Sequence, residues 1–151
     1  MESKIEKAKA LFKSGFNCSQ SVFATYAPDY GIDEKTALRM SASFGGGIGR
    51  MRQTCGAACG LFMLAGLENG STTEHDVEGK ENNYKLVQQL AEKFKEINGS
   101  CICSELLGLE VNSPISPKPE ARTEQYFKKR PCPLLVESAA QIWEDFQKQK
   151  K

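Results

Sequence analysis

A segment of helical length, CGAACGLFMLAGL at 55–67, carries small or apolar side chains on every face. A helix without a polar face has to be covered by other packed elements on all sides. The glycine-rich loop before it, GGGIGRMRQT at 45–54, leaves the backbone free to turn sharply and to approach a neighbouring element closely. Together the two segments predict a bundle around a central apolar helix.

The rest of the chain has the pattern of further helices. Apolar residues recur at helical spacing between Ile5 and Phe12 and between Leu135 and Phe146, and we find no convincing strand pattern. A chain of 151 residues fits one domain. We therefore expect an all-α, single-domain bundle of about six to seven helices over 1–151, with a loop at the proline-rich segment 109–122.

Capping residues predict where the helices start. Asn17 with Gln20, and Ser71 with Glu74, have the spacing of capping boxes. Proline is favoured at the first helical position, so Pro133 indicates that the last helix begins directly after Cys132. The other residues that we assign as N-caps are Asp33, Thr54 and Ser100.

Charge and hydropathy exclude several classes of protein. Twenty Lys and Arg residues face nineteen Asp and Glu residues, so the net charge of +1 favours neither nucleic acid nor an anionic membrane as a partner. The N-terminal stretch MESKIEKAKALFKSG is charged where a secretory signal is apolar, and the longest apolar run, 61–67, is too short to span a bilayer. We expect a soluble, cytoplasmic protein without membrane insertion.

Six cysteines are more than packing requires in a chain of this size. In a reducing cytoplasm they favour metal or redox chemistry over structural disulfides. Four of the predicted helix starts carry a cysteine within about one turn, where the helix dipole stabilises a thiolate over a thiol. These cysteines are Cys18, Cys55, Cys101 or Cys103, and Cys132.

Cys55 combines several of these features. We expect it to be the first residue of the apolar helix, with Arg50 and Arg52 adding positive charge nearby. Cys59 lies four residues further on, too far for an unstrained disulfide with Cys55, and we interpret it as a packing residue. Cys55 is therefore the preferred nucleophile.

At CGAACG, 55–60, the chain resembles the C-GCAxxG-C-C family, which is named for a redox activity and has no agreed substrate. Its four matched cysteines here are Cys18 in FNCSQSV, Cys55 in TCGAACG, Cys103 in CSELLG and Cys132 in RPCPLLV. Cys59 and Cys101 fall outside that set. The resemblance implies a redox role for the four, and a link to transport, since members often lie near transporter genes.

Three functions follow as hypotheses. In the first, the four cysteines form a thiol redox centre of a thiol-dependent oxidoreductase, with Cys55 as nucleophile and Cys18, Cys103 and Cys132 as resolving or secondary thiols. In the second, the same four hold zinc or an iron–sulfur cluster, although the usual C-x-x-C spacing is absent. In the third, the chain is a non-catalytic interaction module, since His75 is the only histidine and is expected at the surface.

Partners follow less directly from the sequence. We expect an unknown redox partner and allow for a homo-oligomer through exposed apolar stripes. The basic cluster 128–130 before Cys132 is expected to be a solvated surface that could also raise the thiolate fraction of Cys132 or bind an anion.

Overall fold

The computed structural model describes residues 3–110 and 112–150. In these residues the fold is all-α, as predicted, and the only β-type pairing is an isolated bridge between Thr54 and Ile102. The helices are α1 (Ile5–Lys13), α2 (Cys18–Tyr26), α3 (Glu34–Ser41), α4 (Gly56–Asn69), α5 (Val77–Asn98), α6 (Cys103–Leu106), α7 (Glu124–Lys129) and α8 (Cys132–Gln149), with short 3₁₀ turns at Ala27–Tyr30 and Ala42–Phe44.

Two of the predicted caps are confirmed. The side chain of Asn17 accepts the backbone N–H of Gln20 at 2.8 Å, and the side chain of Gln20 accepts the N–H of Asn17 at 3.0 Å. This reciprocal pair is a complete capping box at the start of α2. Asp33 caps α3 by accepting the N–H of Thr36. Both caps depend on residues close in sequence, which is why spacing alone located them.

Two other predicted caps are wrong. Asp76, rather than Ser71, caps α5 by accepting the N–H of Gly79 at 2.9 Å, and the Ser71 hydroxyl donates to the Asp76 carboxylate. A carboxylate is the stronger acceptor at a positively polarised helix end. At α4 the N-cap is Cys55 rather than Thr54, because the Thr54 backbone pairs with Ile102 and the helix begins at Gly56.

Two helices after residue 100 also start elsewhere than predicted: α6 begins later in the chain, and α8 begins one residue earlier. α6 starts at Cys103 instead of directly after Ser100, whose hydroxyl accepts the N–H of Ile102 and donates to Glu105. α8 starts at Cys132 itself. α7 was not predicted, since six residues are too few to show a periodic pattern.

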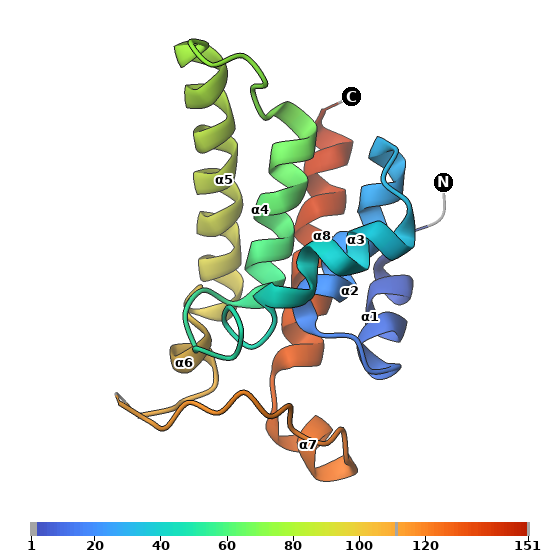
Figure 1. The fold of residues 1–151 in the computed structure, drawn as a ribbon, viewed down its shortest axis with the longest axis vertical. Helices are drawn as coiled ribbons and strands as arrows, with labels where there is room; N and C mark the ends of the chain where they lie inside the picture. The colour runs from blue at the N-terminus through green and yellow to red at the C-terminus, as the bar shows by residue number, and fades with distance from the viewer. Residues whose placement is uncertain (1–2, 111, 151) are drawn as a thin grey trace.

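The longer helices α4, α5 and α8 run along the long axis of the molecule, and α1, α2 and α3 lie on one side of them (Figure 1). α4 packs against α2, α5 and α8. It is buried at every position from Gly56 to Leu61, whereas Phe62, Met63 and Leu67 are half-buried. The contacts of α4 are therefore most complete at its N-terminal end.

Two glycines on one face of α4 bring it close to α2. A β-carbon at Gly56 would lie 2.5 Å from the Cys18 sulfur, and one at Gly60 would lie 2.9 Å from the Val22 β-carbon. Neither separation is possible between non-bonded atoms, so α2 can lie at this distance only while both residues lack a side chain. The first and last residues of the GAACG stretch thus set the spacing of the two helices.

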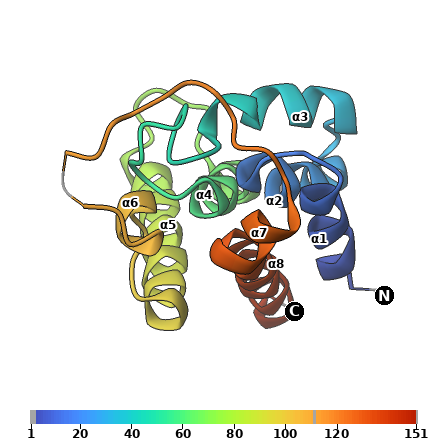
Figure 2. The same ribbon diagram turned by 90° about the horizontal axis from the view of Figure 1, so that it is seen from below.

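The N-terminal ends of α2, α4 and α8 lie at the same end of the molecule as α6, α7 and the glycine-rich loop (Figures 1 and 2). The proline-rich segment arches across this end when it is viewed from below (Figure 2). None of the helices in the described parts of the chain has the length and apolar character needed to cross a bilayer. The clustered helix starts define the region where a site is expected.

Replacing Gly60 by alanine is expected to lower the free energy of unfolding by about 1–3 kcal/mol, because the new methyl group overlaps Val22 in a packed interface. Gly66→Ala, in the same helix with open space around it, is the matched control. It is expected to be neutral or to stabilise by up to about 1 kcal/mol through helix propensity. Urea unfolding of both variants measures the difference, and equal effects would contradict the packing argument.

Candidate functional site

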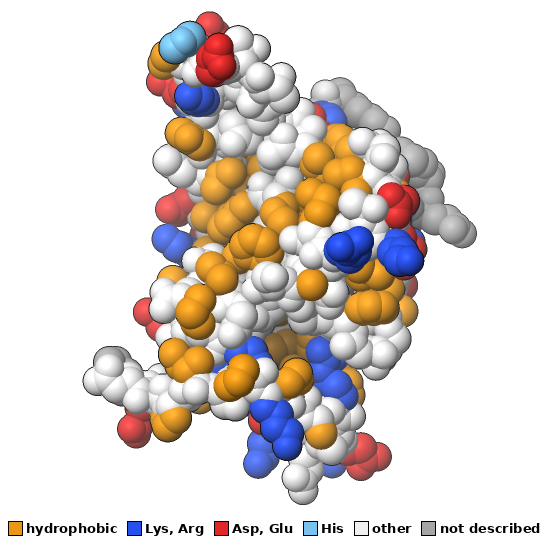
Figure 3. Space-filling view, viewed as in Figure 1, with side chains coloured by type: hydrophobic (Ala, Val, Ile, Leu, Met, Phe, Trp, Pro, Cys, Tyr) orange, Lys and Arg blue, Asp and Glu red, His pale blue; other side chains and the backbone are white. Residues whose placement is uncertain are grey.

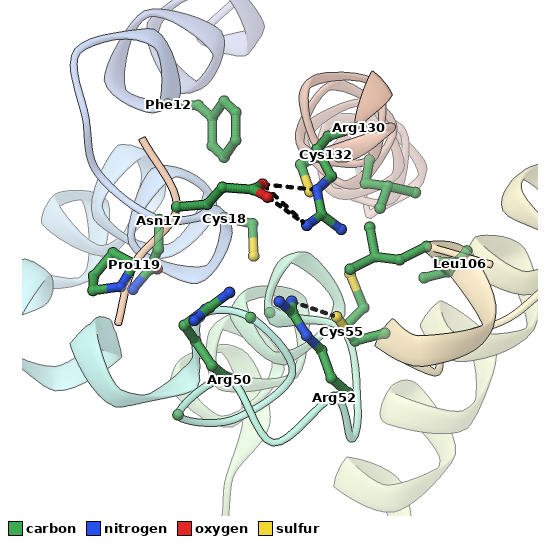
Figure 4. Close-up of a pocket in the computed structure, with 18 of the residues that line it drawn as sticks. Phe12, Asn17, Cys18, Arg50, Arg52, Cys55, Leu106, Pro119, Arg130 and Cys132 are labelled. Atoms are coloured by element: carbon green, nitrogen blue, oxygen red, sulfur yellow. Dashed lines mark hydrogen bonds and ion pairs between the residues drawn. The ribbon is translucent and has the colours of Figure 1, made fainter. Parts of the chain in front are cut away.

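Four cysteines from four helices line one cavity of about 290 Å³ at this end of the molecule (Figure 4). Each lies at the start of its helix. Cys18, Cys103 and Cys132 are the first residues of α2, α6 and α8, and Cys55 is the N-cap of α4. We call this space, with its four sulfur atoms, the thiol cavity. The helix-start positions that the sequence predicted are therefore brought together by the fold.

All six cysteines of the chain are free thiols, and those of the cavity are poorly accessible. Cys55 is 3 % exposed, Cys103 7 % and Cys18 9 %, whereas Cys132 is half-buried. Burial disfavours a charged thiolate, so any ionised sulfur here needs hydrogen-bond donors around it.

Cys18 has such donors. The Cys55 thiol and the backbone N–H groups of Gly46, Ser19 and Cys18 itself act on the Cys18 sulfur as hydrogen-bond donors that favour its ionised form. These four donors outweigh burial and lower the pKa of Cys18 from 9.0 to about 6. Cys18 is therefore a thiolate at neutral pH.

The predicted low pKa of Cys55 is wrong. Its hydrogen bond to Cys18 and its burial raise the pKa of Cys55 well above its ordinary value. The N–H groups of Ala57 and Ala58, at the start of α4, act in the opposite direction but do not prevail. Two thiols in contact hold one negative charge more easily than two, so Cys55 keeps its proton while Cys18 is ionised.

The other two cavity cysteines are also protonated at neutral pH. Burial raises the pKa of Cys103 although Arg52 donates from Nη1 to its sulfur at 3.7 Å. Burial and the charge of Cys18 raise the pKa of Cys132 to about 11, and a hydrogen bond with Tyr126 only partly compensates. Location at a helix start is thus not enough to ionise a buried thiol.

The glycine-rich loop reaches the cavity in an unusual backbone conformation. Positive φ angles occur at Gly46, Gly47 and Gly49, and also at Ile48, Arg50 and Arg52. For residues with side chains this region costs about 1–3 kcal/mol each and is typical of functional segments. A β-carbon at Gly47 would lie 2.6 Å from that of Cys103, so the loop passes directly beside this cysteine.

Arginines make the cavity strongly basic, and Lys and Arg side chains border a hollow at the lower end of the molecule (Figure 3). Arg50 donates to the carbonyls of Ser116 and Lys118 in the proline-rich segment, the first at 2.7 Å. Sequence reasoning missed Arg122 and Glu120, because the proline-rich segment carries no periodic signal. The arginines that line the cavity are Arg50, Arg52, Arg122 and Arg130, and Glu120 is the lining carboxylate.

Arg122 and Arg130 are held by different partners. Arg122 donates to the backbone carbonyls of Phe12 and Phe16 and lies over the Phe12 ring, 4.0 Å from its centroid. Arg130 makes two 3.0 Å hydrogen bonds to Glu120, which lower the pKa of that carboxyl group. Within residues 3–110 and 112–150, Arg130 is the only one of the four cavity arginines that forms an ion pair with a carboxylate.

The remaining two cysteines lie outside the thiol cavity. Cys59 donates weakly to the Thr54 carbonyl at 3.8 Å, and Cys101 to the Ala91 carbonyl at 3.7 Å. Both are buried, in agreement with a packing role for Cys59. Of the pair Cys101 and Cys103, it is Cys103 that lines the cavity.

The side chains of residues 3–110 and 112–150 include no group of three or more His, Cys, Asp or Glu residues arranged to hold a metal ion. The four cavity cysteines surround an open space instead of converging on one point. The described residues therefore do not fit a metal ion at this site.

The fold and the cavity define an all-α protein with four cysteines at helix starts, three of them buried and Cys132 half-buried. Residues 16–146 match the family described as "Putative redox-active protein (C_GCAxxG_C_C)", and the chain belongs to that family. No curated protein and no solved structure matches the chain. The resemblance seen in the CGAACG motif is thereby confirmed at the level of the family.

The titration of Cys18 is a direct test of the site. We expect one thiolate per chain to form with a midpoint near pH 6, since a lowered pKa populates the anion above that pH and protonates it below. The absorbance of the thiolate near 240 nm measures this titration step, and Cys18→Ser should abolish the step. Cys55→Ala should raise the midpoint by about one pH unit or more, because a hydrogen bond to a charged group is lost.

Cys101→Ser is the control for this titration, because Cys101 lies outside the thiol cavity. It should leave the midpoint unchanged. A first midpoint near 9 in the unmodified protein would contradict the assignment of Cys18.

Proposed function

We propose that this protein is a thiol–disulfide oxidoreductase in which Cys18 is the nucleophile and Cys55 the resolving thiol. The observation that carries the proposal is that Cys18 and Cys55, at the starts of α2 and α4, line the wall of one cavity, with the pKa of Cys18 lowered and that of Cys55 raised. A thiolate beside a protonated thiol is the arrangement that disulfide exchange requires.

The reaction proceeds in two exchanges. The Cys18 thiolate attacks a substrate disulfide, one sulfur of which leaves with the electron pair and takes the proton of Cys55. Cys55, now a thiolate, attacks the Cys18 sulfur of the mixed disulfide, and the second substrate sulfur leaves and is protonated by solvent. The substrate disulfide is reduced to two thiols while Cys18 and Cys55 are oxidised to a disulfide.

Cys103 and Cys132 are secondary thiols in this proposal. Both line the same cavity, and the charge of Cys18 acts on the pKa of each, which supports their nearness to the primary pair. They exchange disulfides with Cys18 or Cys55 after the first turnover. A dithiol reductant, the expected redox partner, restores the reduced protein in the cytoplasm.

The test is to oxidise the reduced protein with a limiting amount of a small disulfide and to map the products by mass spectrometry. The unmodified protein should contain a Cys18–Cys55 disulfide. Cys55→Ser should accumulate a mixed disulfide on Cys18 that lasts at least about ten times longer, because the adjacent resolving thiol is gone. Cys18→Ser should form neither product.

Cys101→Ser is the matched control, a buried thiol outside the cavity, and should behave as the unmodified protein does. Stoichiometric zinc or iron in anaerobically purified protein would replace the proposal with the metal hypothesis. If Cys18→Ser and Cys55→Ser react with the small disulfide to the same extent as the unmodified protein, the result would favour an interaction module.

A further inference from the structure

The thiol cavity has the size of a small-molecule site. Its volume of about 290 Å³ lies at the lower end of the range for ligand pockets. The sulfur of Cys18 faces this space from a residue that is 9 % exposed. A disulfide on the surface of a folded protein would have to extend deep into the cavity to reach it, whereas a small disulfide can enter whole.

The charge of the cavity is far from balanced. Among the described residues, Arg50, Arg52 and Arg122 have no carboxylate within ion-pair distance, and the lining carboxylate, Glu120, is bound by Arg130. The partners that Arg50 and Arg122 do have are neutral backbone carbonyls, which leave the positive charge in place. The cavity therefore keeps excess positive charge even when Cys18 is a thiolate.

Arg50 and Arg52 are directed into this space by the backbone. Both have positive φ angles, 63° and 61°, in the glycine-rich loop. Both side chains point from the loop toward Cys18 and are half-buried (Figure 4). Residues held in a disfavoured conformation with unpaired charges beside a nucleophile indicate a recognition role.

Apart from Asn17 and Tyr126, the other side chains of the lining are apolar. Phe12, Leu106, Leu135 and Pro119 contribute side chains around the sulfur atoms. A ligand that fits carries a negative group at the loop and an apolar body with the reactive bond at Cys18.

We propose that the substrate is a small anionic disulfide, bound by its carboxylate groups at Arg50 and Arg52 with its S–S bond against Cys18. This inference rests on the proposed function and names the class of substrate for the same site. Arg50 and Arg52 are binding residues. Arg52, which donates to the Cys103 sulfur, also places positive charge where it would stabilise the thiolate that leaves the substrate.

The atoms and electrons balance as in the two exchanges above. One S–S bond of the substrate breaks and the Cys18–Cys55 S–S bond forms. Two electrons pass from the protein dithiol to the substrate, which leaves as two anionic thiols. The protons come from Cys55 and from solvent.

Three disulfides of similar size test the inference: 3,3′-dithiodipropionate, which is dianionic, bis(2-hydroxyethyl) disulfide, which is neutral, and cystamine, which is dicationic. The rate of Cys18–Cys55 disulfide formation is measured with each on the full-length reduced protein. Each rate is divided by the rate of the same reagent with dithiothreitol, which removes intrinsic reactivity. We expect the dianion to react about tenfold or more faster than the neutral compound, and the dication most slowly.

The double variant Arg50→Gln/Arg52→Gln should lose this preference, so that its ratio of dianion rate to neutral rate falls to about one, whatever loss of absolute rate the two reagents share. A cooperative urea unfolding transition like that of the unmodified protein shows that the variant is folded. Arg50→Lys/Arg52→Lys should restore most of the preference by returning the charge. Arg39→Gln, an exposed arginine of α3 outside the cavity, is the matched control and should change nothing.

The outcomes separate the two proposals. Equal normalised rates for the three reagents, or a preference that survives the double Gln variant, would overturn the substrate class and leave the proposed function standing. Oxidation of Cys18 by a protein disulfide but by none of the small reagents would also overturn it. Failure of every disulfide to oxidise Cys18 would overturn the proposed function itself.

Discussion

The close approach of α2 to α4 is the constraint on which the thiol cavity depends. Gly56 leaves room for the Cys18 sulfur, and Gly60 lets Val22 lie against the helix one turn later. With larger side chains the two helix starts would separate, and the thiols of Cys18 and Cys55 would lose their hydrogen bond. The glycines next to the cysteines in the CGAACG motif are therefore as necessary to the chemistry as the sulfur atoms.

A single negative charge organises the electrostatics of the cavity. Buried thiols ionise poorly, and the donors around Cys18 are enough for one anion only. The pKa of Cys55 is raised by its hydrogen bond to that anion, by burial and by charge repulsion, and the pKa of Cys132 is raised by burial and by charge repulsion. One nucleophile and several proton-bearing thiols thus arise from four cysteines in similar helical positions, without any difference in their own chemistry.

The sequence was sufficient for the longer helices and for the presence of cysteines near helix starts, because capping and periodicity are local properties, but it did not predict the six-residue helix α7. Spacing alone located the N-caps Asn17 and Asp33. The predicted N-cap of α5 was wrong because the Asp76 carboxylate is a better acceptor than the Ser71 hydroxyl. The order of the thiol pKa values could not be predicted, since it depends on how α2 meets α4. Arg122 was missed because tertiary contacts alone determine its position.

The two primary thiols belong to helices that are well separated along the chain. A disulfide between Cys18 and Cys55 would enclose α2, α3 and the glycine-rich loop in a covalent ring. Closing a ring of that length reduces the conformational entropy of the unfolded chain, which raises the free energy of the unfolded state by about 4 kcal/mol. Oxidation would then raise the stability of the protein against unfolding, and reduction would lower it again. The melting temperature of this molecule would report its oxidation state.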